Sequence, residues 1–328
     1  MKDITIYGCG GAGISALINN GEFLNSVGVK TVAVDSSDSN IGSLNFDNKY
    51  KLSGKYGSGG NQLENIDAFR DSIPDILANH KPSKFNIIVS STSGGSGSVV
   101  SMYLAREIVR RGHIAVLVLL TTSDSLRRIN NTINVIKTLE SMSTKLEKPL
   151  VMMVHNQGIR DVRRSGDAGL YANLKSIVYL FANQFADVDE MDIVNLFSYD
   201  KVTKVPPQLV TLVSEEITDE FIDRIIKSKP PVSFIGLVNS EYRDDHIIPI
   251  PSAYSKTGYF DRVSTIDECG YQPTIGRCYY IENQSKHDLL SKFEQLKQES
   301  LETNAASVSK KIDYSADDDS GDGFIHQD

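Results

Sequence analysis

The sequence predicts an α/β protein with a doubly wound parallel sheet, and two observations carry this prediction. Short apolar runs rich in β-branched residues recur along the first half of the chain, as is typical of strands buried on both faces. Segments with apolar residues at three- and four-residue spacing lie between these runs and indicate amphipathic helices. Strand and helix therefore alternate, which is the pattern of βαβ units.

The elements of the first half follow from these two patterns. The expected strands are residues 4–7, 31–34, 86–90, 115–120 and 150–154. The expected helices are residues 98–111, 125–146 and 168–185.

The second half has a different texture, because prolines such as Pro206-Pro207 and Pro230-Pro231 interrupt it. We expect strands at 232–238 and 274–281 in a smaller, mixed unit, and an amphipathic helix at 286–302. The predicted division is a first domain at 1–166, a central helix at 167–188, a second domain at 189–284, a C-terminal helix at 285–303 and an acidic tail at 304–328.

The composition predicts a soluble, cytoplasmic protein. The 328 residues are 40% hydrophobic and 23% charged, which suits a globular fold. The longest apolar run, 114–120, is too short to span a membrane, and the N-terminus has no signal-peptide pattern. The three cysteines are odd in number and lack metal-type spacing, so we expect reduced thiols.

The net charge of −8 is concentrated at the C-terminus. Residues 313–328 contain six aspartates and neither lysine nor arginine, so the rest of the chain is nearly neutral. A nucleic-acid-binding protein is expected to have a basic face. We therefore expect no direct nucleic-acid binding, and a tail that either touches a basic partner or only solubilises the protein.

A glycine-rich loop follows the first expected strand. Residues 8–13 read G-C-G-G-A-G and match G-x-G-x-x-G, and Asp35 ends the second strand. This is the dinucleotide fingerprint, in which glycines admit the pyrophosphate and the acid binds ribose. Taken alone, it favours an NAD(P)- or FAD-dependent oxidoreductase.

Two further glycine clusters favour a different ligand. They are G-S-G-G-N at 57–61 and S-G-G-S-G-S at 93–98, and the latter follows a buried strand and opens a helix. Consecutive small residues at a helix N-terminus suit an anion. Three such loops suit a chain of phosphates better than a single pyrophosphate, and since no P-loop lysine is present, Mg²⁺ would share in neutralising their charge.

The three loops together resemble the phosphate-contacting loops of the tubulin/FtsZ superfamily. The segments at 149–156, 189–193 and 205–209 resemble the phage-encoded tubulin-like proteins of large nucleus-forming phages. The resemblance covers residues 1 to about 285. It implies a tubulin/FtsZ-like α/β fold, with a Rossmann-like GTP-binding domain, a long central helix and a smaller α+β second domain.

The resemblance also implies the residues that bind GTP or GDP. Asp35 would lie near Mg²⁺ and the phosphates, Asp124 and Asn130 near the ribose, and Asn156 and Asn173 at the base. The phosphates would be held by Gly10, Gly11, Ala12, Gly13, Gly59, Gly60, Asn61, Ser93, Gly94, Gly95, Ser96, Gly97 and Ser98.

The catalytic residues implied by the resemblance are Asp189 and Asp192. In this family the acidic loop acts on the nucleotide of the next subunit, so assembly would be head-to-tail and would give a filament. The acidic tail would contact the neighbouring subunit. A phage protein of this kind would form a spindle that positions phage DNA in the host cytoplasm. The alternatives are the oxidoreductase above and a nucleotide-binding scaffold without turnover.

Overall fold

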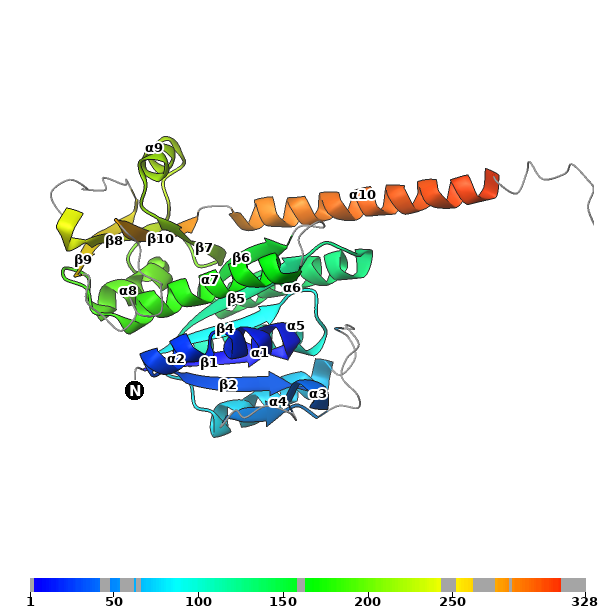
Figure 1. Ribbon diagram of the computed structural model, residues 1–328, viewed down its shortest axis with the longest axis horizontal. Helices are drawn as coiled ribbons and strands as arrows, with labels where there is room; N and C mark the ends of the chain where they lie inside the picture. Colours follow the sequence, from blue (N-terminus) through cyan, green and yellow to red (C-terminus); the bar gives the residue numbers. More distant parts are fainter. Residues whose placement is uncertain are drawn as a thin grey trace, which may run out of the picture.

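The computed structural model describes residues 3–41, 48–53, 62, 66–157, 163–242, 252–261, 275–282 and 285–313. Within these residues the strands form one ten-stranded sheet in the order β3-β2-β1-β4-β5-β6-β7-β10-β8-β9. Helices cover both faces of the sheet, and the last helix projects far beyond it (Figure 1). The predicted α/β class with a doubly wound sheet is therefore confirmed.

The first six strands are parallel to their neighbours. All five strands expected in the first half are present, each extended by one or more residues. The additional strand, β3, is a short Lys-Tyr-Lys segment whose lysines are exposed, so it has no apolar run to indicate it. The bounds are β1 (Ile4–Cys9), β2 (Lys30–Asp35), β3 (Lys49–Lys51), β4 (Phe85–Ser91), β5 (Ile114–Thr122) and β6 (Leu150–Gln157).

The second unit continues the same sheet. Its first strand pairs in parallel with β6, with Leu209 opposite Leu150, and the remaining pairs are of both kinds. One helix covers this part through Phe221 and Ile225, which pack on Phe234 and Tyr280. The bounds are β7 (Leu209–Glu216), α9 (Asp219–Lys227), β8 (Ser233–Asn239), η2 (Ser240–Tyr242), β9 (Tyr254–Phe260) and β10 (Gly276–Glu282).

Two helical layers enclose the parallel part of the sheet, because successive strand residues point to opposite faces. In β4, Ile87 faces one apolar cluster and Ile88 the other. The first layer consists of α1 (Gly10–Asn19), α2 (Gly21–Val27), α7 (Arg163–Ala182) and α8 (Glu190–Phe197). The second consists of α4 (Ile66–Asn79), α5 (Ser96–Arg110) and α6 (Leu126–Leu146), while α3 (Asp38–Ile41) follows β2.

The central helix α7 is held by its buried face. Leu170, Leu174 and Ile177 have no solvent exposure, and the Phe181 ring stacks on Phe85 with centroids 4.6 Å apart. The helix spans Arg163–Ala182, so it begins before the predicted start at 168 and ends before the predicted end at 185. The following residues instead form a turn bridged between Phe185 and Val188, in which Asp187 adopts φ 65°, a left-handed conformation uncommon for a residue other than glycine.

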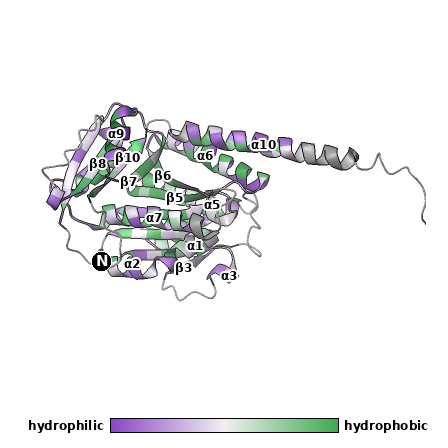
Figure 2. Cartoon of the chain, turned by 45° about the horizontal axis from the view of Figure 1, so that its top comes forward, coloured by the Kyte–Doolittle hydropathy of each residue, from purple (hydrophilic) through white to green (hydrophobic). Residues whose placement is uncertain are grey.

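The last helix, α10 (Ser285–Asp313), packs on α6 and continues past its predicted end at 303. Phe293 lies against Ile129 and Ile133, and Lys137 pairs with Glu294 at 2.9 Å. Residues 304–313 contain alanines and lysines, which favour helix. Figure 2 shows the central strands largely hydrophobic and the visible face of α10 largely polar.

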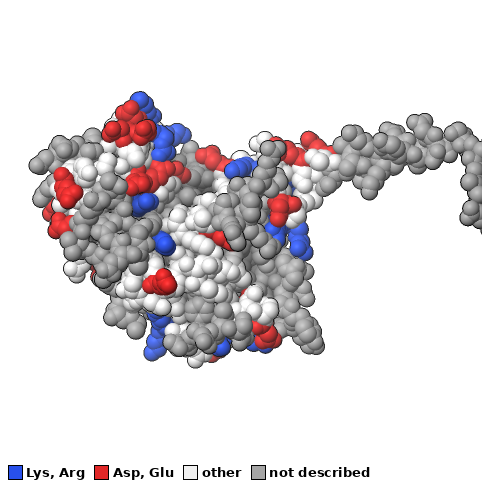
Figure 3. Space-filling view, in the orientation of Figure 1, with Lys and Arg blue, Asp and Glu red and all other residues white. Residues whose placement is uncertain are grey.

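The surface carries charges of both signs. On the face seen in Figure 3, acidic and basic side chains lie next to each other. Arg224 of α9 also forms an ion pair with Glu215 of β7. Exposed pairs of this kind contribute little to stability. Within the described parts of the chain, no helix combines the length and apolar character needed to cross a bilayer.

Candidate functional site

A pocket of about 270 Å³ lies where β1, β2 and β4 end. The chain order of the sheet reverses at β1, so α1 and α5 leave the sheet on opposite faces and a crevice opens between them. The pocket is lined by Cys9, Gly10, Gly11, Ala12, Asp35, Ser36, Ser37, Asn40, Ser91, Gly94, Gly95, Ser96 and Gly97.

Two glycines allow the helices α1 and α5 to start side by side. Gly10 has φ 71°, and a Cβ at this position would lie 3.0 Å from the Cα of Gly97. A Cβ at Gly97 would lie 2.6 Å from the carbonyl oxygen of Cys9. The first backbone N–H groups of both helices have no partner within their helix, and the helix dipoles add positive potential. The arrangement therefore suits a polyanion such as a chain of phosphates.

Asp35 ties the loop after β2 to the start of α5. Its carboxylate accepts hydrogen bonds from Ser36 N at 2.7 Å, from the Asn40 amide at 2.6 Å and from the Ser96 hydroxyl at 3.1 Å. The residue is 2% exposed. These donors compensate the buried charge, so the carboxylate can lie beside an anion site without an unpaired oxygen directed at it.

Two further side chains line this pocket, the hydroxyl of Ser36 and the thiol of Cys9. The Ser36 hydroxyl is buried and has no hydrogen-bond partner among the described residues, so it remains available to a ligand. The sequence offered no signal for it beyond its place next to Asp35. Burial raises the pKa of the Cys9 thiol, and the nearby Asp35 carboxylate adds to the rise. Cys9 is therefore a neutral, unreactive thiol.

The third glycine loop is held from behind by two amides that sequence reasoning missed. The Gln62 amide donates to Thr92 O at 3.1 Å and to the Ser98 hydroxyl at 2.9 Å, and Asn131 donates to Ser93 O at 3.0 Å. Gln62 directly follows the second glycine cluster, and this position was the only feature of the sequence that could have indicated its role. The predicted residues Gly59, Gly60 and Asn61 lie outside the described residues.

Several predicted ligand residues do not line this pocket. Asp124 pairs with Arg128 at 2.6 Å, and Asn156 is exposed and accepts a hydrogen bond from Thr121. Asn130 and Asn173 are partly exposed on α6 and α7. Gly13, Ser93 and Ser98 are buried or nearly so behind the pocket wall. Of the phosphate candidates, the pocket thus brings together Gly10 to Ala12 and Gly94 to Gly97, whereas the ribose and base candidates remain predictions.

The acidic loop lies at the opposite edge of the sheet. Asp189 and Asp192 form a reciprocal capping box at the start of α8, with Asp192 N donating to Asp189 at 2.9 Å and Asp189 N donating to Asp192 at 3.1 Å. The next residue, Glu190, pairs with Lys84, which immediately precedes β4. The pocket lies at the other end of β4, about 20 Å away along the strand. In Figure 1, α8 and α3 mark these two opposite ends.

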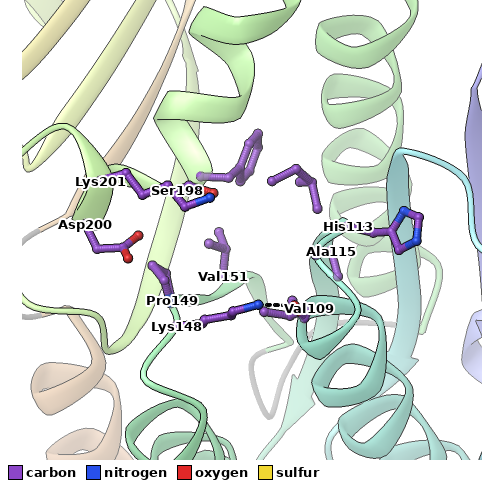
Figure 4. A pocket seen from close by; sticks show the side chains of 12 residues that line it. Val109, His113, Ala115, Lys148, Pro149, Val151, Ser198, Asp200 and Lys201 are labelled. Carbon is purple, nitrogen blue, oxygen red and sulfur yellow. Dashed lines mark hydrogen bonds between the residues drawn. The ribbon is translucent and has the colours of Figure 1, made fainter.

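A second, smaller pocket of about 60 Å³ lies at the same edge as the acidic loop. It is bounded by the end of α5, the starts of β5 and β6, and η1 (Tyr199–Lys201). Figure 4 shows Lys148 donating to the carbonyl of Val109, which caps the end of α5 at 3.1 Å. Asp200 extends into it from η1, with one carboxylate oxygen buried and unpaired among the described residues.

No protein-family model matches the chain. Among curated proteins, it is 24% identical over 210 residues to a phage tubulin-like protein of Pseudomonas phage PhiPA3, covering 63% of this chain and 65% of the relative. It is 25% identical over 273 residues to a phage tubulin-like protein of Pseudomonas phage phiKZ, covering 78% and 79%. The match to the first of these relatives thus spans just under two thirds of that protein's length.

Solved structures show the same fold. A protofilament of TubZ from bacteriophage PhiKZ superposes with a TM-score of 0.80 at 21% identity, covering 100% of this chain and 96% of that one. The phage tubulin PhuZ with GDP superposes with a TM-score of 0.81 at 18% identity, covering 93% of each chain. FtsZ of M. jannaschii gives 0.64 at 18% identity, covering 85% and 90%. The expected tubulin/FtsZ-like fold is therefore confirmed.

Proposed function

We propose that this chain, which is similar to phage tubulin-like proteins and has the tubulin/FtsZ-like fold, is a polymerising GTPase whose filaments hydrolyse GTP at the contacts between subunits. The observation that carries the proposal is the separation of two features. The anion pocket lies at the carboxyl edge of the sheet, and the acidic loop lies at the opposite edge. Neither edge can complete the reaction within one molecule.

The phosphates of GTP would lie between the starts of α1 and α5. Backbone N–H groups of Gly10 to Ala12 and of Gly94 to Gly97 would donate to them, with Gly59, Gly60 and Asn61 closing over the γ-phosphate. Asp124 and Asn130 would contact the ribose, and Asn156 and Asn173 would contact the base through their amides. The close approach of Gly97 to Gly10 supports a ligand held by backbone rather than by side chains.

Mg²⁺ fits this pocket as a phosphate-bound ion. Within the part of the chain that the structure describes, no group of three His, Cys, Asp or Glu residues could hold a metal ion. Mg²⁺ commonly binds through one or two carboxylates together with substrate phosphates and water. Asp35 lines the pocket and would lie near the ion, which would neutralise phosphate charge that no P-loop lysine reaches.

Hydrolysis would then occur in trans. When subunits stack head-to-tail, the edge bearing Asp189 and Asp192 faces the pocket of the next subunit, and a contact of this type that does not close produces a filament. Phosphoryl transfer needs mainly positioning and charge stabilisation, and an aspartate can accept a proton from the attacking water. Turnover is therefore a consequence of assembly.

The relatives suggest the biological setting. Two of them are phage tubulin-like proteins, and one solved neighbour is a protofilament. The chain would form a spindle that positions phage DNA in the host cytoplasm. Its acidic tail would strengthen the longitudinal contact by lying on the neighbouring subunit.

The hydrogen bonds of the Asp35 carboxylate disfavour the oxidoreductase alternative. In a dinucleotide enzyme this acid must accept hydrogen bonds from ribose hydroxyls. Here its carboxylate already accepts from Ser36, Asn40 and Ser96 and is buried. The strand order β3-β2-β1-β4-β5-β6, which such enzymes share, fits both functions.

The test compares GTP, GDP and NAD at increasing protein concentration. Light scattering, pelleting and electron microscopy measure filaments, and phosphate release measures turnover. We expect GTP alone to give filaments above a critical concentration, with turnover per molecule rising at the same threshold. Turnover per molecule that is independent of concentration would contradict the split site. Filaments without phosphate release would indicate a nucleotide-binding scaffold.

A further inference from the structure

The acidic loop is built onto strand β9 of the second unit. Ala186 and Tyr259 exchange both backbone hydrogen bonds, each at 2.8 Å. Gly258 makes this approach possible, because a Cβ there would lie 2.7 Å from Cγ2 of Val188 and 3.1 Å from Ala186 O. The loop that ends in Asp189 is therefore attached to β9 as well as to the central helix.

The same strand supplies two side chains to Asp192. The Tyr254 hydroxyl donates to Oδ1 of Asp192 at 2.6 Å, and the Lys256 ammonium lies 3.4 Å from the same oxygen. The other oxygen accepts from Asp189 N. Asp192 is thus held by three donors and its side chain is 14% exposed, whereas Asp189 is exposed.

The spacing of these residues explains how strand β9 both contacts Asp192 and leaves room for the acidic loop. Residues i, i+2 and i+4 of a strand point to the same face. Tyr254, Lys256 and Gly258 therefore form one row, in which two side chains reach Asp192 and the third position leaves room for Val188. The row faces the acidic loop along its length.

We propose that Tyr254 and Lys256 are positioning residues for hydrolysis: they set the orientation of Asp192 and, through the capping box, that of Asp189. This inference rests on the proposed function. Asp189 keeps a carboxylate exposed towards the next subunit, while Lys256 offsets part of the negative charge that would otherwise repel the approaching phosphates. The second unit thereby fixes the geometry of a site completed by another molecule.

The experiment uses the full chain with Tyr254→Phe, which removes one hydroxyl and keeps the ring. The measured quantities are GTP affinity, polymer mass by pelleting, and phosphate release per polymerised subunit. We expect release per polymerised subunit to fall about tenfold, since small displacements of catalytic groups cost one to two orders of magnitude. GTP affinity should stay within about twofold, because the pocket lies at the other edge of the sheet.

Tyr50→Phe is the matched control, because Tyr50 also donates to a carboxylate, that of Asp75, at 2.6 Å, but on β3. Lys256→Met should reproduce the loss and Lys256→Arg should restore most of the rate. Unchanged release in both Tyr254→Phe and Lys256→Met would overturn the inference. So would a loss of polymer mass with an unchanged rate per polymerised subunit, which indicates a merely structural role. A wild-type chain that neither assembles nor releases phosphate would refute the proposed function instead.

Discussion

Replacing Gly97 by alanine tests the contact on which the anion pocket depends. A Cβ at 97 would come 2.6 Å from Cys9 O, whereas ordinary contact begins at 3.4 Å. The two loops must therefore separate by about 0.8 Å. Overpacking of this kind costs about 1–3 kcal/mol, against which the better helix propensity of alanine returns about 1 kcal/mol. We expect a net loss of about 0–2 kcal/mol in the free energy of unfolding.

The effect on the ligand should be larger than the effect on stability. Displacing the amides of one helix start by close to 1 Å should weaken GTP binding by about 100-fold. The assay is titration with a fluorescent GTP analogue, alongside denaturant unfolding. Gly94→Ala is the matched control in the same loop, since a Cβ there would meet Ser91 O at 3.7 Å, an ordinary contact. Equal GTP affinity in the two variants would refute the reasoning.

Three further predictions concern catalysis, the tail and pH. Asp189→Asn keeps a good N-cap for α8 but removes the negative charge. GTP binding should therefore persist, while phosphate release from the polymer should fall at least about tenfold and the filaments should be long-lived. A normal rate of phosphate release would argue against a catalytic role for Asp189. Deleting residues 313–328 should raise the critical concentration for assembly, and more strongly at low salt, as measured by pelleting across a salt series. An unchanged critical concentration would show that the tail makes no contact with the neighbouring subunit. Hydrogen bonds from Arg110 lower the pKa of Glu107 from 4.5 to about 2, against the opposing effect of burial and with help from Arg111. The stability that Glu107 contributes is present above pH 4.5 and lost as the pH falls towards 2, so Glu107→Gln should lose less of its thermal stability over that range, and parallel pH profiles would contradict this.

The strands of the core could be predicted because their signal is local. Val116 to Leu120 form an uninterrupted apolar run, and such a run indicates a strand buried on both faces wherever it lies in the chain. The glycine loops at 8–13 and 93–98 were visible for the same reason, since their residues are consecutive. By contrast, β3 owes its pairing to β2 and not to its own Lys-Tyr-Lys sequence.

The end of the central helix was predicted less well. The apolar spacing continues through Phe185, which is buried, so periodicity alone extends the helix to 185. The residue lies in a bridged turn instead, because Ala186 pairs with Tyr259, which is far away in the sequence. Phe185 and Val188 are therefore buried because their segment pairs with β9, and not because they lie on the apolar face of a helix.

Residue types and their order along the chain thus sufficed for the buried strands of the first half, for β8 and β10, and for the positions of the glycine loops in the chain, whereas β7 and β9 were not predicted. The meeting of Gly10 with Gly97, the support of the third loop by Gln62, and the hold of Tyr254 on Asp192 across 62 positions required the folded chain. The physical reason is the sheet: its strand order determines which loops share an edge, and that order depends on hydrogen bonds between segments that no short stretch of sequence contains.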